Sequence, residues 1–190
     1  DVHLLEGELV VIHDEQLDRT TNGRGHLAAA GLASVRALDA GNGEQVPLLS
    51  EVLATLNGNV AINVELKGAG TAEPTSKLLR AACATGIWRT DQFLLSAFNH
   101  AELQKADPML ARGVLWGRPA VDMVARSLAI GGQWMNIALE TVTEARITAA
   151  QQAGLKVAVY TVNGPQDLAA MRALGVDAVF CDYPERGLQP

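Results

Sequence analysis

Residues 1–14 read DVHLLEGELVVIHD, and the rest of the chain can be interpreted outward from them. Apolar residues on both sides of Gly7 predict two short strands joined by a glycine turn. If the turn centres on Gly7, His13 lies opposite Asp1, and directly paired residues have Cβ atoms roughly 5 Å apart. A carboxylate and an imidazole would then project together from the end of a sheet, which suits a metal-assisted acid/base site.

Beyond this stretch, apolar segments alternate with segments of helical periodicity. Strands are predicted at 60–66, 92–95, 111–115, 134–138, 156–162 and 178–181. Between them, Leu49 and Leu53 fit one helical face, Thr143 suits a helix cap, and Pro165 suits a first helical position. The chain therefore repeats a strand–helix unit.

Repeated strand–helix units imply a parallel sheet with helices outside it. The predicted fold class is α/β, a TIM (β/α)₈ barrel, which typically needs ~250 residues and at least ~200. The chain has 190 residues, so we expect a barrel that is incomplete at its N-terminus, within a longer protein. An open doubly wound sheet is the alternative, but no phosphate-binding glycine-rich turn supports it. We expect residues 1–190 to form a single domain, with 14–45 as a cap or insertion loop.

Composition narrows the possible partners. The net charge of −6 argues against nucleic acid as a partner, because nucleic-acid binding needs a basic surface. No apolar run approaches the ~20 residues of a membrane-spanning helix. The two cysteines lie far apart and form neither a disulfide framework nor a zinc site.

Three polar residues alternate along one predicted strand, namely Asn63, Glu65 and Lys67. Alternate residues share a face of a strand, whereas Val64 and Leu66 face the other way. Polar side chains inside a barrel must pair with one another, bind water or bind a ligand. Ligand binding is typical of the carboxyl ends of barrel strands, and an internal Glu65–Lys67 ion pair is the alternative.

Several motifs together carry a resemblance to a known family. They are, in chain order, Asp1-Val2, Val10-Val11-Ile12-His13-Asp14, Leu17-Asp18-Arg19-Thr20-Thr21-Asn22-Gly23, Leu38-Asp39-Ala40-Gly41, Val46-Pro47-Leu48-Leu49-Ser50-Glu51-Val52-Leu53, Asn63-Val64-Glu65-Leu66-Lys67, Leu95-Ser96-Ala97-Phe98, Val159-Tyr160-Thr161-Val162-Asn163 and Cys181-Asp182-Tyr183-Pro184. This order resembles the glycerophosphodiester phosphodiesterases of the bacterial cytoplasmic type. The family's first strand, which carries His-Arg-Gly, and a glutamate two residues before the position of Asp1 are lacking here.

The resemblance implies hydrolysis of glycerophosphodiesters to an alcohol and sn-glycerol 3-phosphate, with one divalent cation, Mg²⁺ or Ca²⁺. It implies that Asp1 and Glu65 bind the metal, and that Lys67 binds the phosphate and assists catalysis. His13 would protonate the departing alcohol oxygen. Because the family's other histidine and glutamate are lacking, we expect residues 1–190 alone to have little or no activity.

Head-group contacts, location and assembly are less constrained. Phe98 and Tyr160 are candidate walls for the substrate, with core packing as the alternative. The resemblance implies a cytoplasmic protein with a small-molecule substrate and leaves a secreted form and a homo-oligomer open. Two other functions remain: phospholipase D-like cleavage of lysolipids, and a non-catalytic binding barrel.

Overall fold

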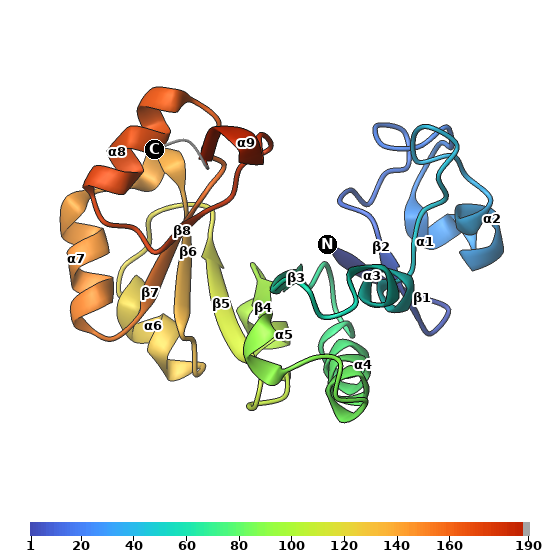
Figure 1. The fold of residues 1–190 in the computed structure, drawn as a ribbon, viewed down its shortest axis with the longest axis horizontal. Coiled ribbons are helices and arrows are strands. Elements are labelled where there is room, and N and C mark those ends of the chain that lie inside the picture. Colours follow the sequence, from blue (N-terminus) through green and yellow to red (C-terminus); the bar gives the residue numbers. More distant parts are fainter. Residues whose placement is uncertain (188–190) are drawn as a thin grey trace. The chain divides into compact units, whose positions relative to one another are not determined.

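The computed structural model describes residues 1–187. The chain divides into two compact units, Asp1–Leu110 and Ala111–Pro190. Each unit has its own strands and its own covering helices (Figure 1). Within the part of the chain that is described, every helix is too short or too polar to cross a membrane.

The first unit opens with an antiparallel hairpin of β1 (Val2–Leu5) and β2 (Glu8–Val11). The two residues between the strands, Glu6 and Gly7, have φ angles of 50° and 87°. Positive φ at both central residues is the requirement of a two-residue type I′ turn, whose twist matches that of the flanking strands. The predicted strand–turn–strand arrangement is therefore confirmed.

The predicted register of this hairpin is wrong by one residue. Val2 pairs with Val11, and the backbone N–H of Ile12 donates to the carbonyl oxygen of Asp1 at 3.1 Å. Ile12 therefore lies opposite Asp1, and His13 lies one residue beyond it. The physical reason is the turn, because Glu6 and Gly7 share it equally instead of Gly7 standing at its centre.

The hairpin continues into a parallel arrangement with β3 (Ile62–Glu65). Val2 bridges to Leu66 in the parallel sense, and the backbone N–H of Lys67 donates to the carbonyl oxygen of Val2 at 2.9 Å. On its other side, β3 pairs in parallel with β4 (Phe93–Ala97). The start of β1 and the ends of β3 and β4 thus meet along one edge.

Residues 14–45 are not a bare loop. They contain the short helices α1 (Leu27–Ala30) and α2 (Leu32–Arg36). Buried side chains from this segment, from the hairpin and from the residues that flank the segment form one apolar cluster, namely Leu5, Val10, Ile12, Leu17, Leu27, Val35 and Val46. The segment is therefore packed onto the hairpin by its own small core, while its role as a cap over the site stays a prediction.

An ion pair fastens this segment to α3 (Leu49–Leu56). The guanidinium of Arg36 donates to both carboxylate oxygens of Glu51, at 2.7 and 2.5 Å. Glu51 also accepts a hydrogen bond from the backbone N–H of Leu48 at 2.8 Å, which satisfies one donor at the start of the helix. The pKa of Glu51 is lowered by the hydrogen bonds from Leu48 and Arg36.

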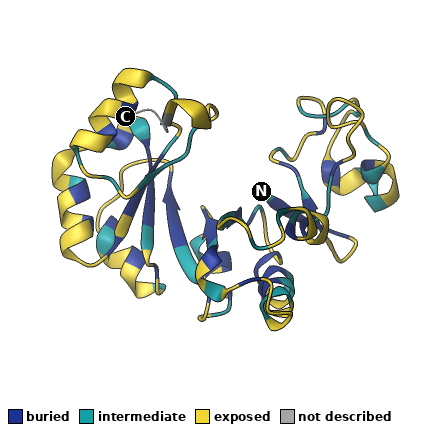
Figure 2. Ribbon diagram, in the orientation of Figure 1, coloured by how far each residue is buried: buried dark blue, intermediate teal, exposed yellow. Residues whose placement is uncertain are grey.

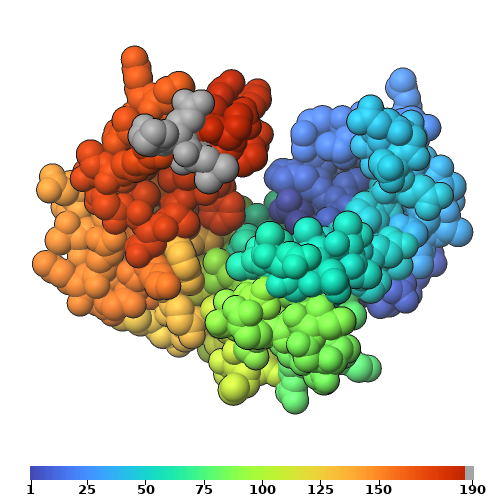
Figure 3. Space-filling model, viewed as in Figure 1, coloured from blue at the N-terminus to red at the C-terminus, as the bar shows by residue number. Residues whose placement is uncertain are grey.

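The remaining helices of the first unit are α4 (Ala72–Ala84), η1 (Thr90–Gln92) and α5 (His100–Leu103). In the space-filling view α3 and α4 adjoin on one surface of this unit (Figure 3). A groove of 310 Å³ runs between them and the hairpin turn, lined by Gly7, Glu8, Leu9, Leu48, Ser50, Pro74, Lys77, Leu78 and Ala81. This groove lies away from the polar side chains of β3 that the sequence singles out.

The second unit is a parallel sheet in chain order. Its strands are β5 (Ala111–Trp116), β6 (Trp134–Ala138), β7 (Lys156–Tyr160) and β8 (Ala178–Val179). The intervening and following helices are α6 (Met123–Ala129), η2 (Leu139–Thr141), α7 (Glu144–Gln152), α8 (Pro165–Ala173) and α9 (Pro184–Gly187). The strands are mostly buried, and α7 and α8 expose their outer faces (Figure 2).

The predicted elements are present, with differences at their ends. Strand β6 has its predicted bounds, and the hydroxyl of Thr143 accepts a hydrogen bond at the start of α7 as expected. Strand β7 ends at Tyr160, two residues before the predicted end. Val162 is fully buried beyond that end, because an apolar pattern reports burial and not strand pairing.

Candidate active site

The polar face of β3 lies where the sequence predicts it. Val64 and Leu66 are each 2% exposed and face the core, whereas Asn63, Glu65 and Lys67 lie on the other face. Parallel strands bring their carboxyl ends to the same edge, which is where barrel enzymes bind ligands. The predicted site residues of this strand therefore stand at a suitable edge.

Three charged side chains gather at this edge, and we call them the strand-end cluster: Asp1, Glu65 and Lys67. The Nζ atom of Lys67 is 2.8 Å from Oε1 of Glu65 and 3.4 Å from Oδ1 of Asp1. The side chains of Asp1, Glu65 and Lys67 are 29%, 17% and 20% exposed. Two carboxylates thus share one side-chain ammonium. The internal Glu65–Lys67 ion pair, weighed as an alternative to ligand binding, is present.

Some oxygens beside this cluster lack hydrogen-bond partners. Asn63 Oδ1 and Ser96 Oγ are buried without one, and Glu65 Oε1 has only its ion pair with Lys67. Ser96 pairs with Glu65 across β3 and β4, so their side chains share a face. Because buried polar atoms nearly always have partners, this face has capacity for water or a ligand.

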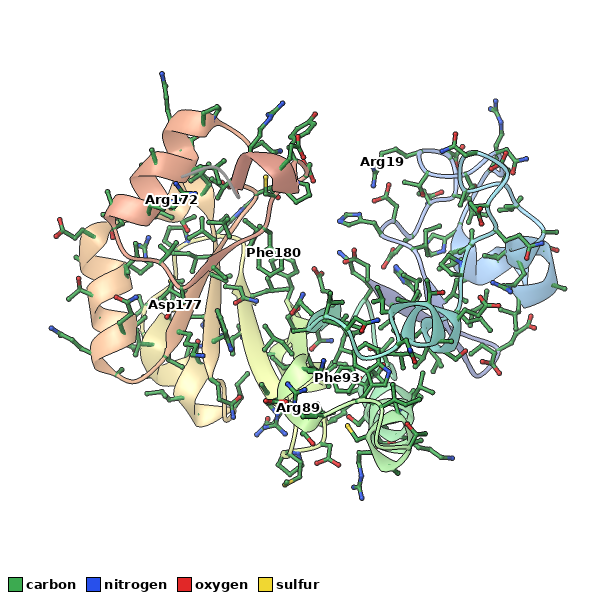
Figure 4. All side chains as sticks on the ribbon, in the orientation of Figure 1. Arg19, Arg89, Phe93, Arg172, Asp177 and Phe180 are labelled. Atoms are coloured by element: carbon green, nitrogen blue, oxygen red, sulfur yellow. The ribbon has the colours of Figure 1, made fainter. Side chains whose placement is uncertain are left out.

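A second polar group lies just after β2, and we call it the loop cluster: His13, Asp14 and Arg19. Nδ1 of His13 is 2.5 Å from Oδ1 of Asp14. Arg19 donates from Nε to Asp14 Oδ2 at 2.5 Å and from Nη2 to Oδ1 at 2.9 Å. Figure 4 labels Arg19 on its loop in the first unit. Hydrogen bonds from Arg19 and His13 hold the pKa of Asp14 well below its ordinary value of 3.8.

The two aromatic candidates lie in different units. Phe98 follows β4 in the first unit and is 48% exposed, which suits a wall more than a core position. Tyr160 ends β7 in the second unit, and its ring meets that of Phe180 edge-on, with centroids 6.4 Å apart. Tyr160 therefore packs against a neighbouring aromatic ring, as the alternative interpretation expected. Contact with the substrate stays a prediction for both Phe98 and Tyr160.

The structure also bears on the predicted metal ligands. Asp1 and Glu65 lie around one ammonium, as hard oxygen ligands of a cation would. Within residues 1–187, however, no group of three or more histidine, cysteine or acidic side chains is close enough to hold a metal ion. The metal site stays a prediction that rests on two carboxylates.

Three side chains at the site, those of Ser96, Asp14 and Arg19, were not among the predicted site residues. Ser96 lies beside Glu65. It could have been predicted, because it is the one polar residue of the apolar strand Phe93–Ala97. Asp14 bonds both His13 and Arg19. The sequence carries no comparable signal for this contact, because neighbouring residues in an extended chain point apart.

Fold and site together define an α/β enzyme with charged side chains at the carboxyl ends of parallel strands. The Glycerophosphoryl diester phosphodiesterase family matches residues 1–186. A glycerophosphodiester phosphodiesterase of Caldanaerobacter subterraneus is 30% identical over 199 residues, covering 97% of this chain and 81% of the relative. One from Bacillus altitudinis is 30% identical over 206 residues, covering 100% of this chain and 83% of the relative.

Solved structures agree. A phosphodiesterase of Oleispira antarctica, in complex with the product sn-glycerol-3-phosphate, has a TM-score of 0.84 at 28% identity, with coverage of 98% of this chain and 81% of that one. A glycerophosphodiester phosphodiesterase of Agrobacterium tumefaciens has a TM-score of 0.80 at 27% identity, with coverage of 98% and 83%. The chain therefore belongs to the glycerophosphoryl diester phosphodiesterase family. The predicted enzyme class, a phosphoric diester hydrolase, and the predicted fold, a partial TIM barrel, are confirmed.

Proposed function

We propose that the protein hydrolyses glycerophosphodiesters to an alcohol and sn-glycerol 3-phosphate at the strand-end cluster. The observation that carries this proposal is that Asp1 and Glu65 share the ammonium of Lys67 at the edge where β3 ends. The names of the relatives and the product bound to the Oleispira antarctica structure support the substrate class.

We assign Asp1 and Glu65 as the residues that would hold one divalent cation, Mg²⁺ or Ca²⁺. Their carboxylate oxygens are hard ligands of the type these ions prefer. The position also favours positive charge, since Lys67 already lies between the two carboxylates. When bound there, the cation supplies positive charge that offsets the charge of the phosphate as the transition state forms.

The chain's own residues bind the phosphate and deliver a proton. Lys67 is a compact point charge whose Nζ suits a non-bridging phosphate oxygen. His13 donates a proton to the alcohol oxygen while the bond from phosphorus to that oxygen breaks, so the alcohol leaves in its neutral form. Over the whole hydrolysis an oxygen of water replaces the alcohol oxygen on phosphorus. Phe98 and Tyr160 are assigned as contacts to the glycerol or head group.

Release of sn-glycerol 3-phosphate from glycerophosphocholine tests the proposal. The protein that contains residues 1–190 is assayed with EDTA and with added Mg²⁺ or Ca²⁺. Chelator-sensitive release that either metal restores is expected, together with little turnover by residues 1–190 alone. Absence of release across several head groups and both metals would contradict the proposal and favour lysolipid cleavage or a non-catalytic barrel.

A further inference from the structure

The loop cluster holds the imidazole of His13 in one arrangement. The carboxylate of Asp14 contacts Nδ1 of His13 at 2.5 Å with one oxygen and Nε of Arg19 at 2.5 Å with the other. Hydrogen bonds from Arg19 and His13 lower the pKa of Asp14, so this carboxylate is ionised and can only accept hydrogen bonds. The hydrogen between Asp14 and His13 therefore belongs to Nδ1 of the imidazole.

From this geometry we propose that Asp14, braced by Arg19, is a positioning residue that keeps the hydrogen of neutral His13 on Nδ1 and presents Nε2 to the substrate. The proposal rests on the proposed function, in which His13 protonates the leaving alcohol. In that step the proton leaves Nε2 of the imidazolium and bonds to the alcohol oxygen. The ring that remains is the neutral Nδ1–H form, which Asp14 favours.

Stability alone does not account for this cluster. The side chains of His13 and Arg19 are 58% and 63% exposed, and exposed ion pairs contribute little to folding. Arg19 Nη2 also lies 3.5 Å from His13 Nδ1, and His3 Nε2 lies 3.4 Å from the carbonyl oxygen of His13. The carboxylate of Asp14 contacts both Arg19 and His13 and therefore links the loop to the imidazole.

The loop that carries Arg19 is itself ordered by hydrogen bonds. The backbone N–H of Leu17 donates to the carbonyl oxygen of Gly25 at 2.9 Å. Asp18 accepts from the N–H of Gly25 at 2.9 Å, and the hydroxyl of Thr21 donates to the carbonyl oxygen of Leu17 at 2.7 Å. Arg19 therefore projects from a closed loop toward Asp14, which is what a bracing side chain needs. Asp18 lies in the same loop and bonds only the backbone among these contacts, so it offers a matched control.

The test compares two leaving groups in the protein that contains residues 1–190. Glycerophosphocholine releases an alkoxide that needs a proton, whereas the p-nitrophenyl ester of glycerol phosphate releases a phenolate that does not. For Asp14→Asn we expect kcat on glycerophosphocholine to fall about 10²-fold or more, because general acid catalysis contributes about that much, with KM nearly unchanged.

On the p-nitrophenyl ester, Asp14→Asn and His13→Ala should retain most of the activity. Arg19→Gln should show the same pattern with a smaller loss, and Asp18→Asn should follow the wild type on both substrates.

A second measurement is independent of turnover. Nitrogen-15 spectra of the histidine side chains distinguish Nδ1–H from Nε2–H, and the wild type should show Nδ1–H at His13. Asp14→Asn should lose that preference, because its amide can also donate to Nδ1. An equal loss on both substrates, or an unchanged tautomer in Asp14→Asn, would overturn the positioning role while leaving the proposed function intact. If the wild type cleaves neither substrate, the proposed function itself fails.

Discussion

The strand-end cluster and the loop cluster lie in the same unit but are held in opposite ways. Lys67 and Glu65 project from or just beyond a regular strand, are 20% and 17% exposed, and leave hydrogen-bonding capacity unused. In the loop cluster, both carboxylate oxygens of Asp14 accept from Arg19, and the imidazole of His13 contacts one of them. The first cluster lies at the end of a strand and leaves hydrogen-bonding capacity unused, whereas the second is exposed and its carboxylate is fully hydrogen-bonded.

This difference separates binding from proton transfer. A site that binds an anion or a cation needs charged groups that the scaffold holds in place and that keep hydrogen-bonding capacity for the ligand. A proton donor needs an exposed ring whose orientation is held by neighbours. Neither cluster is expected to stabilise the fold strongly, because a partly buried ion pair loses hydration and an exposed one is screened.

The largest effect should follow loss of a carboxylate from the strand-end cluster. For Glu65→Gln we expect activity to fall at least about 10²–10³-fold, the range found when one electrostatic group is removed from an active site. The melting temperature should change little, because Lys67 keeps Asp1 as a partner. The measurement is kcat/KM on glycerophosphocholine beside a thermal melt. Glu73→Gln, an exposed carboxylate in the first turn of α4, is the matched control.

The second prediction concerns Lys67, whose ammonium Asp1 and Glu65 share. For Lys67→Met we expect activity to fall roughly 10²-fold. Asp1 and Glu65 then lose their common counter-charge, so Mg²⁺ or Ca²⁺ should raise the melting temperature more than in the wild type. Thermal melts at equal ionic strength, with Na⁺ as the control cation, measure this shift. An equal shift in both proteins would speak against a cation site at these carboxylates.

Alternation along β3 was sufficient to predict the polar face, since side chains of a strand alternate strictly and Val64 is buried as expected. The register of the hairpin was not predictable to one residue, because Glu6 and Gly7 form a turn whose type decides the pairing. The contact of Asp14 with His13 depends on the loop conformation after β2, which no periodic pattern reports. Sequence therefore predicts which faces carry chemistry, and the structure adds how neighbours orient those groups.

Glu102 of α5, a carboxylate outside both clusters, is buried and hydrogen-bonded, and it allows the comparison to be extended to stability. It is 1% exposed and accepts from the N–H of Ala72 at 2.8 Å and from Lys105 at 3.0 Å. Burial raises the pKa of Glu102, but these hydrogen bonds outweigh burial and lower it below 4.5. Glu102→Gln should therefore reduce the free energy of unfolding by about 1–3 kcal/mol at neutral pH.

The pH dependence of this effect has a definite sign. Because the pKa of Glu102 is lower in the folded state, its contribution is present above pH 4.5 and is lost as the pH falls from 4.5 through the folded-state pKa. Urea unfolding of the wild type and of Glu102→Gln should thus converge in acid. A difference that stays constant down to low pH would contradict this account.

The smallest effect on stability should come from Asp14→Asn, the variant with a large expected effect on turnover. The pKa of Asp14 is lowered by Arg19 and His13, so its contribution is present above pH 3.8 and is lost as the pH falls below that value. Its partners are mostly exposed, and salt screens such pairs. The loss in melting temperature should be smaller than for Glu102→Gln and should vanish at about 1 M NaCl, where the screening length is only about 3 Å. Most of the loss from Glu102→Gln should persist at that salt concentration, because the hydrogen bond that Glu102 accepts from the N–H of Ala72 is buried. If Asp14→Asn lowered the melting temperature as much as Glu102→Gln does, and salt did not reduce this loss, the main role of the loop cluster would be to stabilise the fold.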